Sequence, residues 1–268
     1  MTLVERAKAG APVVAVNPPR ILTLDIERFK GRAEIEFWDL SDYKHRRIHA
    51  SDVTQWPRTI CAAWRWYGNR RVNFAAEWGE GGREAMLQTL WDAYHQADIV
   101  VGHNIVGFDT KKLRSEWLLM GLGPPSPWRS VDTLKVARAV FGLESNTLDS
   151  ITKRLGLQGK TDRFDVECAR LAVEGNLRAQ RRLRRYNVGD VIASENLYDA
   201  VRPWIPNHPH IGLWSGDGSS CGNCGGQLKA SGWCRTAVTA YAQYLCTSCG
   251  AWFRRNDIKV RTETRPAR

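Results

Sequence analysis

The sequence lacks the features that would place the protein in a membrane. No apolar run approaches the roughly 18 to 20 residues that a membrane-spanning helix needs, although 43% of the 268 residues are hydrophobic. Residues 1–19 contain one short apolar patch, Ala11–Val16, which Asn17-Pro18-Pro19 then interrupts. They are therefore predicted to form a flexible arm and not a secretory signal, and we expect a soluble, cytoplasmic protein without a membrane partner.

Acidic residues are scarce relative to basic ones. Asp and Glu number 28 against 39 Lys and Arg, which gives a formal net charge of +11 at pH 7. This excess favours a polyanionic partner, and nucleic acid fits better than a membrane surface because no basic amphipathic anchor is evident. A basic protein without such a partner is the alternative. The sequence also lacks a G-x-x-x-x-G-K-S/T phosphate loop, which excludes the P-loop class.

Cysteines are too few and too unevenly placed for a disulfide framework. Cys234 and two others stand alone, and four form two C-x-x-C-G turns: Cys221, Cys224, Cys246 and Cys249. An odd count with paired spacings suits a reducing compartment and a metal site. Four thiolates from two such turns predict one structural Zn²⁺ in a zinc ribbon, which with a basic tail spans residues 221–268. An oxidised or redox-active set of cysteines is the alternative.

Apolar patterning predicts an α/β domain over residues 20–202, joined to the ribbon by a Pro-, Gly- and His-rich linker at 203–220. Strands are expected at 21–27, 33–40, 59–67, 72–76, 97–101 and 128–133, with the second, third and fourth forming an antiparallel meander. Helices are expected at 84–96, from 109 through 118, and at 134–141, 147–155 and 177–201. This order predicts a mixed sheet flanked by helices.

The first strand ends in two carboxylates, Asp25 and Glu27. Side chains on a strand alternate between its faces, so both would project from the same face, with Ile26 directed into the core. Carboxylates held side by side repel each other unless a cation lies between them, and a hard divalent cation prefers oxygen ligands. A solvated strand end would explain the pair equally well, so a metal site requires further acids.

Two later motifs supply those acids. Asn104-x-x-x-Phe108-Asp109 leads into a helix whose first turn holds Asp109, where the helix dipole favours a negative charge and capping is the alternative role. Tyr186-x-x-x-Asp190 places a tyrosine and an acid one turn apart on one face of a later helix. The three motifs thus occur in the order strand, helix start and late helix.

This ordered set resembles the DEDD superfamily of exonucleases, which includes the DnaQ-like proofreading nucleases and has a ribonuclease H-like fold. The resemblance covers about residues 20–202. It is to the tyrosine type, because Tyr186 stands four residues before Asp190, whereas Arg185 occupies the position of the histidine in the other type. The Tyr-Asn-x-x-Asp-Val segment is closest to the YprB-like and phage ribonuclease H-like branches, which implies a bacteriophage-encoded protein of DNA replication or repair, located in the host cytoplasm.

The resemblance implies a catalytic site with two Mg²⁺ or Mn²⁺ ions. Asp25, Glu27 and Asp190 would hold one ion, Asp25 would bridge to the second, and Asp109 would support that second ion. Tyr186 would orient the attacking water or help to deprotonate it. Two metals can clamp the attacking and leaving oxygens of an in-line phosphodiester displacement.

Five further residues are candidates for binding the substrate. The resemblance implies that Asn104 and Phe108 shape the site, although an asparagine that caps the helix is the alternative. Arg181, Arg182 and Arg185 could hold phosphates, although such a cluster is commonly a solvated surface.

Together these features predict a metal-dependent 3′–5′ exonuclease that acts on single-stranded ends, DNA in preference to RNA, and releases nucleoside 5′-monophosphates. A replication or repair protein is a candidate partner. A second class remains open, a non-catalytic nucleic-acid-binding factor that uses the ribbon, because residues 203–268 carry eight Lys and Arg against three Asp and Glu. An RNA exonuclease or a structure-specific nuclease is the third alternative.

Overall fold

A five-stranded mixed sheet forms the centre of the protein in the computed structural model, which describes residues 18–37, 39, 48–157 and 164–264. Its strand order is β5-β4-β1-β6-β7. The strands are β1 (Ile21–Phe29), β4 (Arg58–Trp66), β5 (Asn73–Ala76), β6 (Ile99–Gly102) and β7 (Arg129–Asp132). β1 pairs antiparallel with β4 and parallel with β6, so the first strand is the central one. Most of the predicted arm, residues 1–17, lies outside the described residues.

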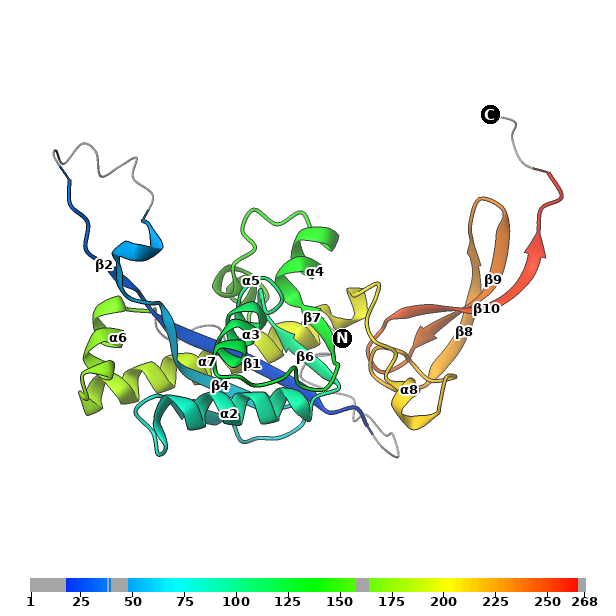
Figure 1. Ribbon diagram of the computed structural model, residues 1–268. Coiled ribbons are helices and arrows are strands. Elements are labelled where there is room, and N and C mark those ends of the chain that lie inside the picture. The colour runs from blue at the N-terminus through cyan, green and yellow to red at the C-terminus, as the bar shows by residue number, and fades with distance from the viewer. Residues whose placement is uncertain (1–17, 38, 40–47, 158–163, 265–268) are drawn as a thin grey trace.

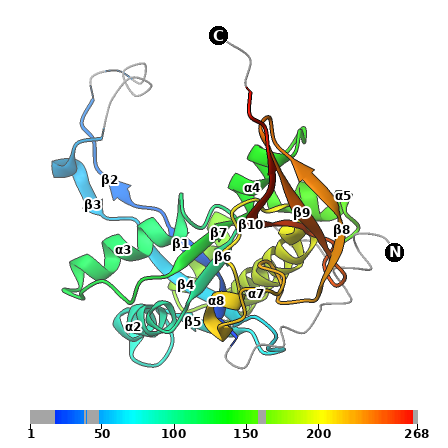
Figure 2. The same ribbon diagram turned by 90° about the vertical axis from the view of Figure 1, so that its right-hand side faces the viewer.

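Helices cover both faces of this sheet, as the mixed α/β prediction requires (Figure 2). α2 (Gly82–His95) and α3 (Asp109–Leu119) lie on one face. The other face carries α4 (Thr133–Val140), α5 (Leu148–Arg154) and the 25-residue α7 (Leu177–Val201), with α6 (Val166–Val173) packed against α7. None of the helices in the described ranges is long and apolar enough to cross a membrane.

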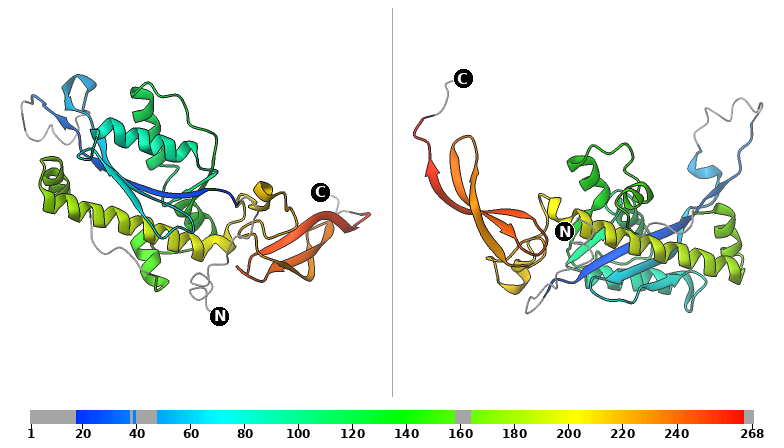
Figure 3. Two further views of the ribbon diagram at one scale, coloured as in Figure 1. Left: turned by 90° about the horizontal axis from the view of Figure 1, so that it is seen from below. Right: turned by 180° about the vertical axis from the view of Figure 1, so that it is seen from behind.

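The alternation of β1 decides which side chains face α7. Leu22, Leu24 and Ile26 are buried in the core beneath α2 and α3, and each buried aliphatic side chain contributes about 1.5 to 3 kcal/mol. The intervening positions face the opposite way, and Ile21 joins the core beneath α7. Asp25 and Glu27 follow Ile21 in this alternation, so they project toward α7, which crosses the sheet beside β1 (Figure 3).

The predicted strand at 33–40 was wrong. The chain forms only the two-residue β2 (Arg32–Ala33), which pairs with β3 (Val53–Gln55) outside the main sheet. Residues 34–37 form no strand, and 38 and 40 lie outside the described residues. The antiparallel meander consists of β1, β4 and β5, because β4 takes the place beside β1. The alternating pattern at 33–40 therefore has no core to face, and Phe37 is 50% exposed.

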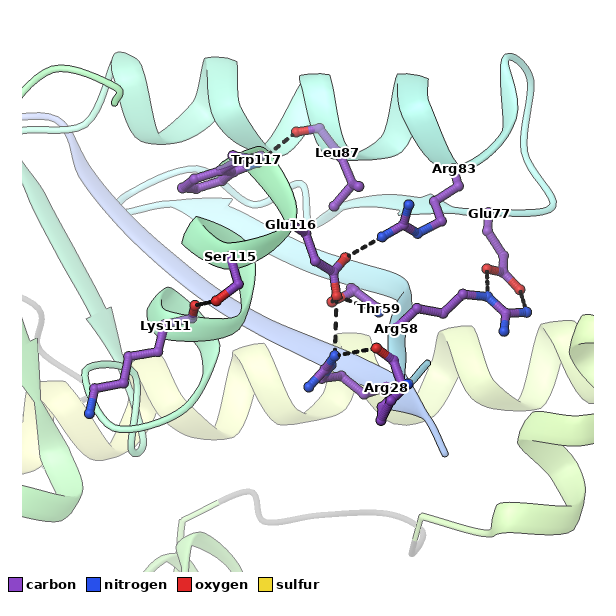
Figure 4. Close-up of polar contacts among 11 residues, drawn as sticks. Arg28, Arg58, Thr59, Glu77, Arg83, Leu87, Lys111, Ser115, Glu116 and Trp117 are labelled. Carbon is purple, nitrogen blue, oxygen red and sulfur yellow. Dashed lines mark hydrogen bonds and ion pairs between the residues drawn. The ribbon is translucent and has the colours of Figure 1, made fainter. Parts of the chain in front are cut away.

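Glu116, a buried carboxylate on α3, forms hydrogen bonds at the point where the register between β1 and β4 is irregular. Their register shifts between Glu27, which pairs with Cys61, and Arg28, which pairs with Thr59. Glu116 accepts hydrogen bonds from Thr59 N at 2.9 Å and Thr59 Oγ1 at 3.0 Å. It also pairs with Nη2 of Arg28 at 3.3 Å and Nη2 of Arg83 at 3.1 Å (Figure 4). One side chain thus joins β1, β4, α2 and α3.

Glu116→Gln is expected to lower the free energy of unfolding by about 2 to 3 kcal/mol. All its partners are donors, so an amide NH₂ in place of one oxygen leaves a buried donor facing another donor. Urea unfolding followed by circular dichroism measures the change. Glu84→Gln, on the exposed side of α2, removes the same charge and should change stability by less than about 0.5 kcal/mol. Equal midpoints for the two variants would contradict this role of Glu116.

The C-terminal residues form a separate three-stranded antiparallel sheet of order β10-β9-β8, which extends away from the α/β part (Figure 1). Its strands are β8 (Leu228–Arg235), β9 (Thr239–Cys246) and β10 (Trp252–Arg261), and we call residues 221–264 the ribbon.

The segment before the ribbon is packed and hydrogen-bonded. After α7 it forms η3 (Arg202–Trp204) and the short α8 (Gly212–Ser215). Ile205 and Ile211 are 8% and 0% exposed, and Asn223 Nδ2 of the ribbon donates to the carbonyl of Arg202 at 2.8 Å. The ribbon is therefore anchored at the end of α7, and the domain limits drawn from the sequence stay a prediction.

Candidate metal and active site

Three carboxylates from two distant segments meet between β1 and α7. Asp25 and Glu27 project from the strand, and Asp190 projects from the helix. One oxygen of each lies within 4.8 Å of the others. Asp190 is 3% exposed and Glu27 is 9% exposed, whereas Asp25 is half-buried, so water reaches the cluster mainly beside Asp25.

The chemistry of this cluster suits a hard divalent cation. Buried like charges at such distances raise the free energy of the folded chain unless a positive charge is shared among them. Oxygen ligands of one Mg²⁺ lie at about 2.1 Å from it, hence at most about 4.2 Å from one another. A small movement of side chains already within 4.8 Å of one another would meet that limit. Asp25, Glu27 and Asp190 therefore fit a Mg²⁺ or Mn²⁺ ion.

Asp109 lies beside this cluster but is not one of its three members. Its Oδ1 accepts the amide of Ile26 at 3.1 Å, between the two acids of β1. β6 pairs with β1 only as far as Thr23. Beyond Thr23 the chain turns from β6 into α3, and this turn brings Asp109 to the edge of β1 that β6 no longer pairs with. Burial raises the pKa of Asp109 to about 7, and the charge of Asp132 adds to the rise. A nearby cation would favour the ionised form.

The helix α7 contributes two further polar side chains. Tyr186 is 8% exposed and lines the same cleft as Asp25 and Asp190. Asn187 donates its Nδ2 to Asp25 Oδ2 at 2.7 Å and to the Asp25 carbonyl at 3.2 Å. This contact fixes the orientation of the Asp25 carboxylate. Sequence reasoning missed it, although Asn187 stands three residues before Asp190 and hence on the same helix face.

Asn104 also lines the cleft, in a backbone conformation that few residues other than glycine adopt, with φ 68°. The carboxylate of Asp132 holds it there by accepting the amides of Asn104 at 3.0 Å and Val106 at 3.2 Å, together with two amides at the start of α4. A Cβ on Gly107 would lie 2.3 Å from Asn104 Oδ1, so a larger residue there would displace the Asn104 side chain. Sequence reasoning did not identify Asp132. Phe108 is 39% exposed and lies outside the cleft lining.

The cleft beside the carboxylates has a volume of about 790 Å³. α7 and β1 form one side, and residues of α4 and α5 form another. Two cations, Arg138 and Lys153, come from these helices. Arg138 is exposed, and Lys153 pairs with Asp149 at 2.8 Å. The cleft is thus wide enough for a nucleotide-sized group and combines acids on one side with cations on another.

The three arginines singled out from the sequence do not line this cleft. Arg181 borders a separate hollow between β5 and α7. Arg182 pairs with Asp165 at 3.1 Å, and Arg185 is exposed elsewhere on the helix. Five residues on a helix correspond to a rotation of about 140°, so Arg185 points well away from the direction of Asp190.

The four paired cysteines form a second candidate metal centre. Their sulfurs lie within 4.8 Å of one another, and all four residues are buried. Cys221 and Cys249 have sulfurs 3.6 Å apart, as do Cys224 and Cys246. A tetrahedral Zn²⁺ with sulfur at about 2.3 Å places its ligands about 3.8 Å apart, whereas a disulfide is about 2.05 Å. The set therefore fits zinc, and Cys234 on β8 lies outside it.

Comparisons with known proteins found likenesses to two DNA polymerases. No protein-family model matches the chain. The curated "DNA polymerase III PolC-type" of Thermotoga petrophila is 30% identical over 105 residues, which is 38% of this chain, and the match spans only 7% of the relative's length. A family B DNA polymerase structure from the archaeon Pyrobaculum calidifontis aligns with a TM-score of 0.51 and 18% identity, over 74% of this chain and 26% of that chain. The latter likeness shows a shared fold.

Proposed function

We propose that this protein is a metal-dependent 3′–5′ exonuclease that removes nucleotides from single-stranded ends, DNA in preference to RNA, and releases nucleoside 5′-monophosphates. The same proposal makes it a tyrosine-type DEDD nuclease with a ribonuclease H-like fold. The observation that carries it is the convergence of Asp25, Glu27 and Asp190 within 4.8 Å, beside a cleft that Asp25, Asp190 and Tyr186 line.

The acids of β1 and α7 would hold the metal ions. Asp25, Glu27 and Asp190 would be the ligands of one ion, and Asp109 would support a second from its place beside Ile26. Bound divalent ions supply positive charge for the scissile phosphate and for both the attacking and leaving oxygens. Metal binding requires Asp109 to be ionised, which opposes the effect of burial on its pKa.

The uncharged groups of the cleft would position water and substrate. The Tyr186 hydroxyl orients the attacking water toward the phosphorus, and Asn187 keeps the Asp25 carboxylate turned toward the cluster through its 2.7 Å hydrogen bond. Asn104 offers its side-chain amide to the sugar or base of the terminal nucleotide. Arg138, exposed on the facing wall, neutralises a neighbouring phosphate.

DNA is favoured as the substrate because both compared proteins are named DNA polymerases. The net charge of +11 favours the binding of DNA and RNA alike, because both are polyanions. Discrimination between DNA and RNA depends on contacts to the 2′-hydroxyl, so RNA is the alternative substrate of the same site.

A labelled oligonucleotide tests this proposal directly. With Mg²⁺ or Mn²⁺, a 5′-labelled single strand should shorten one nucleotide at a time from its 3′ end, and chromatography should identify nucleoside 5′-monophosphates. Excess EDTA should stop the reaction, and a matched RNA strand should be degraded more slowly. A circular single strand, which has no end, is the control and should stay intact. Cleavage of the circle, or internal fragments from the linear strand, would refute exonuclease action.

A further inference from the structure

One face of the ribbon sheet combines aromatic rings with cations. In an antiparallel ladder, cross-strand partners lie on the same face. Leu245 of β9 pairs with Lys229 of β8 and with Trp252 of β10. Further along the same face of β9, Gln243 pairs with Arg254 and Tyr241 pairs with Ile258. We define the basic face by the residues Lys229, Tyr241, Trp252, Arg254, Ile258 and Arg261.

The zinc centre lies on the other side of this sheet. Leu228 pairs with Cys246, and Phe253, the neighbour of Trp252, packs against the cysteine cluster together with Leu228. Because alternate residues of a strand face opposite ways, Trp252 and Arg254 point away from the metal centre. The basic face is therefore not needed to build the zinc site.

The side chains of the basic face are accessible. Trp252 is 56% exposed and Ile258 is 45% exposed, and Lys229, Arg254 and Arg261 are exposed as well. In Figures 1 and 3 the three strands extend from the α/β part, and none of the helices drawn for the described residues covers the distal part of their sheet. An exposed tryptophan among cations is typical of a binding surface.

Positive charge predominates on the ribbon strands. β8, β9 and β10 hold six Lys and Arg and a single acid, Asp257, which is paired with Lys259. Arg254 already stacks on Tyr241, with its Cζ 3.9 Å from the ring centroid. This contact holds the Arg254 guanidinium against the Tyr241 ring before any ligand binds. Little side-chain ordering is then needed when a ligand binds.

We propose that the basic face binds single-stranded nucleic acid, with bases stacked on Trp252 and on the Arg254–Tyr241 pair and phosphates held by Lys229 and Arg261. Trp252 and Arg254 are two residues apart along β10, or about 6.8 Å, which leaves room for one base at each. Bases expose their flat faces only when unpaired, so a single strand fits this surface better than a duplex. The proposal does not depend on the carboxylate site.

Fluorescence anisotropy with the full chain tests the stacking. The probes are 5′-fluorescein oligo-dT and oligo-rU of about 20 nucleotides, longer than the ~4 to 16 nucleotides that a small single-strand-binding module covers. No Mg²⁺ or Mn²⁺ is added, so binding is separated from hydrolysis. Trp252→Ala should weaken binding about tenfold. Trp233→Ala is the matched control, because Trp233 is 47% exposed but pairs with Ala242 on the opposite face, and it should bind like the parent protein.

A pair of charge variants tests the phosphate contacts. Lys229→Ala combined with Arg261→Ala should weaken binding and make the slope of log Kd against log salt less steep by about 1.4, since each phosphate contact on a single strand contributes about 0.7. Arg235→Ala combined with Arg255→Ala removes the same charge from the opposite face, where Arg235 pairs with Ala240 and Arg255 lies over Tyr244. It should leave the slope nearly unchanged.

Three results would overturn the proposal. They are no binding of either probe by zinc-loaded protein, equal binding by the two tryptophan variants, or equal effects of the two charge variants. The first result would indicate that the basic face binds another protein. The last result would indicate that nucleic acid is attracted by the net charge of the whole ribbon and not by the basic face. None of them bears on hydrolysis at the carboxylates, which is measured separately with divalent metal.

Discussion

Asp190→Asn is expected to slow oligonucleotide hydrolysis by at least about 10³-fold, which corresponds to roughly 4 kcal/mol of lost transition-state stabilisation. Asparagine keeps the size of the side chain but removes one of the three charges that meet within 4.8 Å. The variant should still fold. Without metal it should be as stable as the parent or more stable, because the repulsion of Asp190 with Asp25 and Glu27 is relieved.

Metal binding provides a readout of this site that does not require turnover. A ligand that binds only the folded state raises its melting temperature, so Mn²⁺ should stabilise the parent protein and have much less effect on Asp190→Asn. Asp92→Asn, which removes an exposed charge on α2, is the matched control for both measurements. If Asp190→Asn retained the parent rate and the Mn²⁺-dependent shift, the proposed metal site would be wrong.

Cys246→Ser is expected to release zinc and to unfold the ribbon while the five-stranded part stays folded. The buried cluster of the ribbon consists of the four paired cysteines and Ala251, with Leu228 and Phe253 packed against it. So little apolar surface cannot offset the entropy of ordering the chain. In zinc-finger peptides the metal contributes about 10 to 16 kcal/mol, and the loss of one ligand removes much of this.

Zinc content and limited proteolysis check this result. The variant should contain much less zinc per chain and should be cleaved rapidly after residue 220, leaving a resistant fragment that includes α7. Cys234→Ser is the control, because Cys234 lies on β8 outside the metal cluster, and it should keep one zinc ion and parent-like resistance. Full zinc occupancy and protease resistance in Cys246→Ser would show that the ribbon does not depend on the fourth thiolate.

Local patterns predicted elements well where a segment is long and has clear start and stop signals. The predicted helix at 177–201 matches α7, because its apolar residues recur at helical spacing and Asn176 caps its first turn. The strand predicted at 33–40 from an alternating pattern does not form, although that prediction also rested on a local pattern. A period of two shows that a strand could form there, but it does not show which neighbour the strand would pair with, and β4 occupies that place.

Some residues of the candidate site could be recognised from the sequence, and others only from the structure. Asp25 and Glu27 could be assigned to one strand face from their spacing, since alternation is a property of the local backbone. Asn187 and Asp132 could not be recognised, because their importance comes from hydrogen bonds to Asp25 and to the turn around Asn104, which are far away in the sequence. The arginine cluster was identified from composition, and the helix rotation directs it away from the cleft, so its role in substrate binding stays a prediction.

By itself the sequence determined the elements with strong periodicity, the excess of positive charge and the two C-x-x-C turns, because these depend on bonded geometry and composition. Only the tertiary structure decided that β1 is central, that α7 brings Asp190 to Asp25 and Glu27, and that Arg138, not the cluster at 181–185, faces the cleft. The physical reason is that pairing and packing depend on competition among all segments for one core, and no short stretch of sequence contains that information.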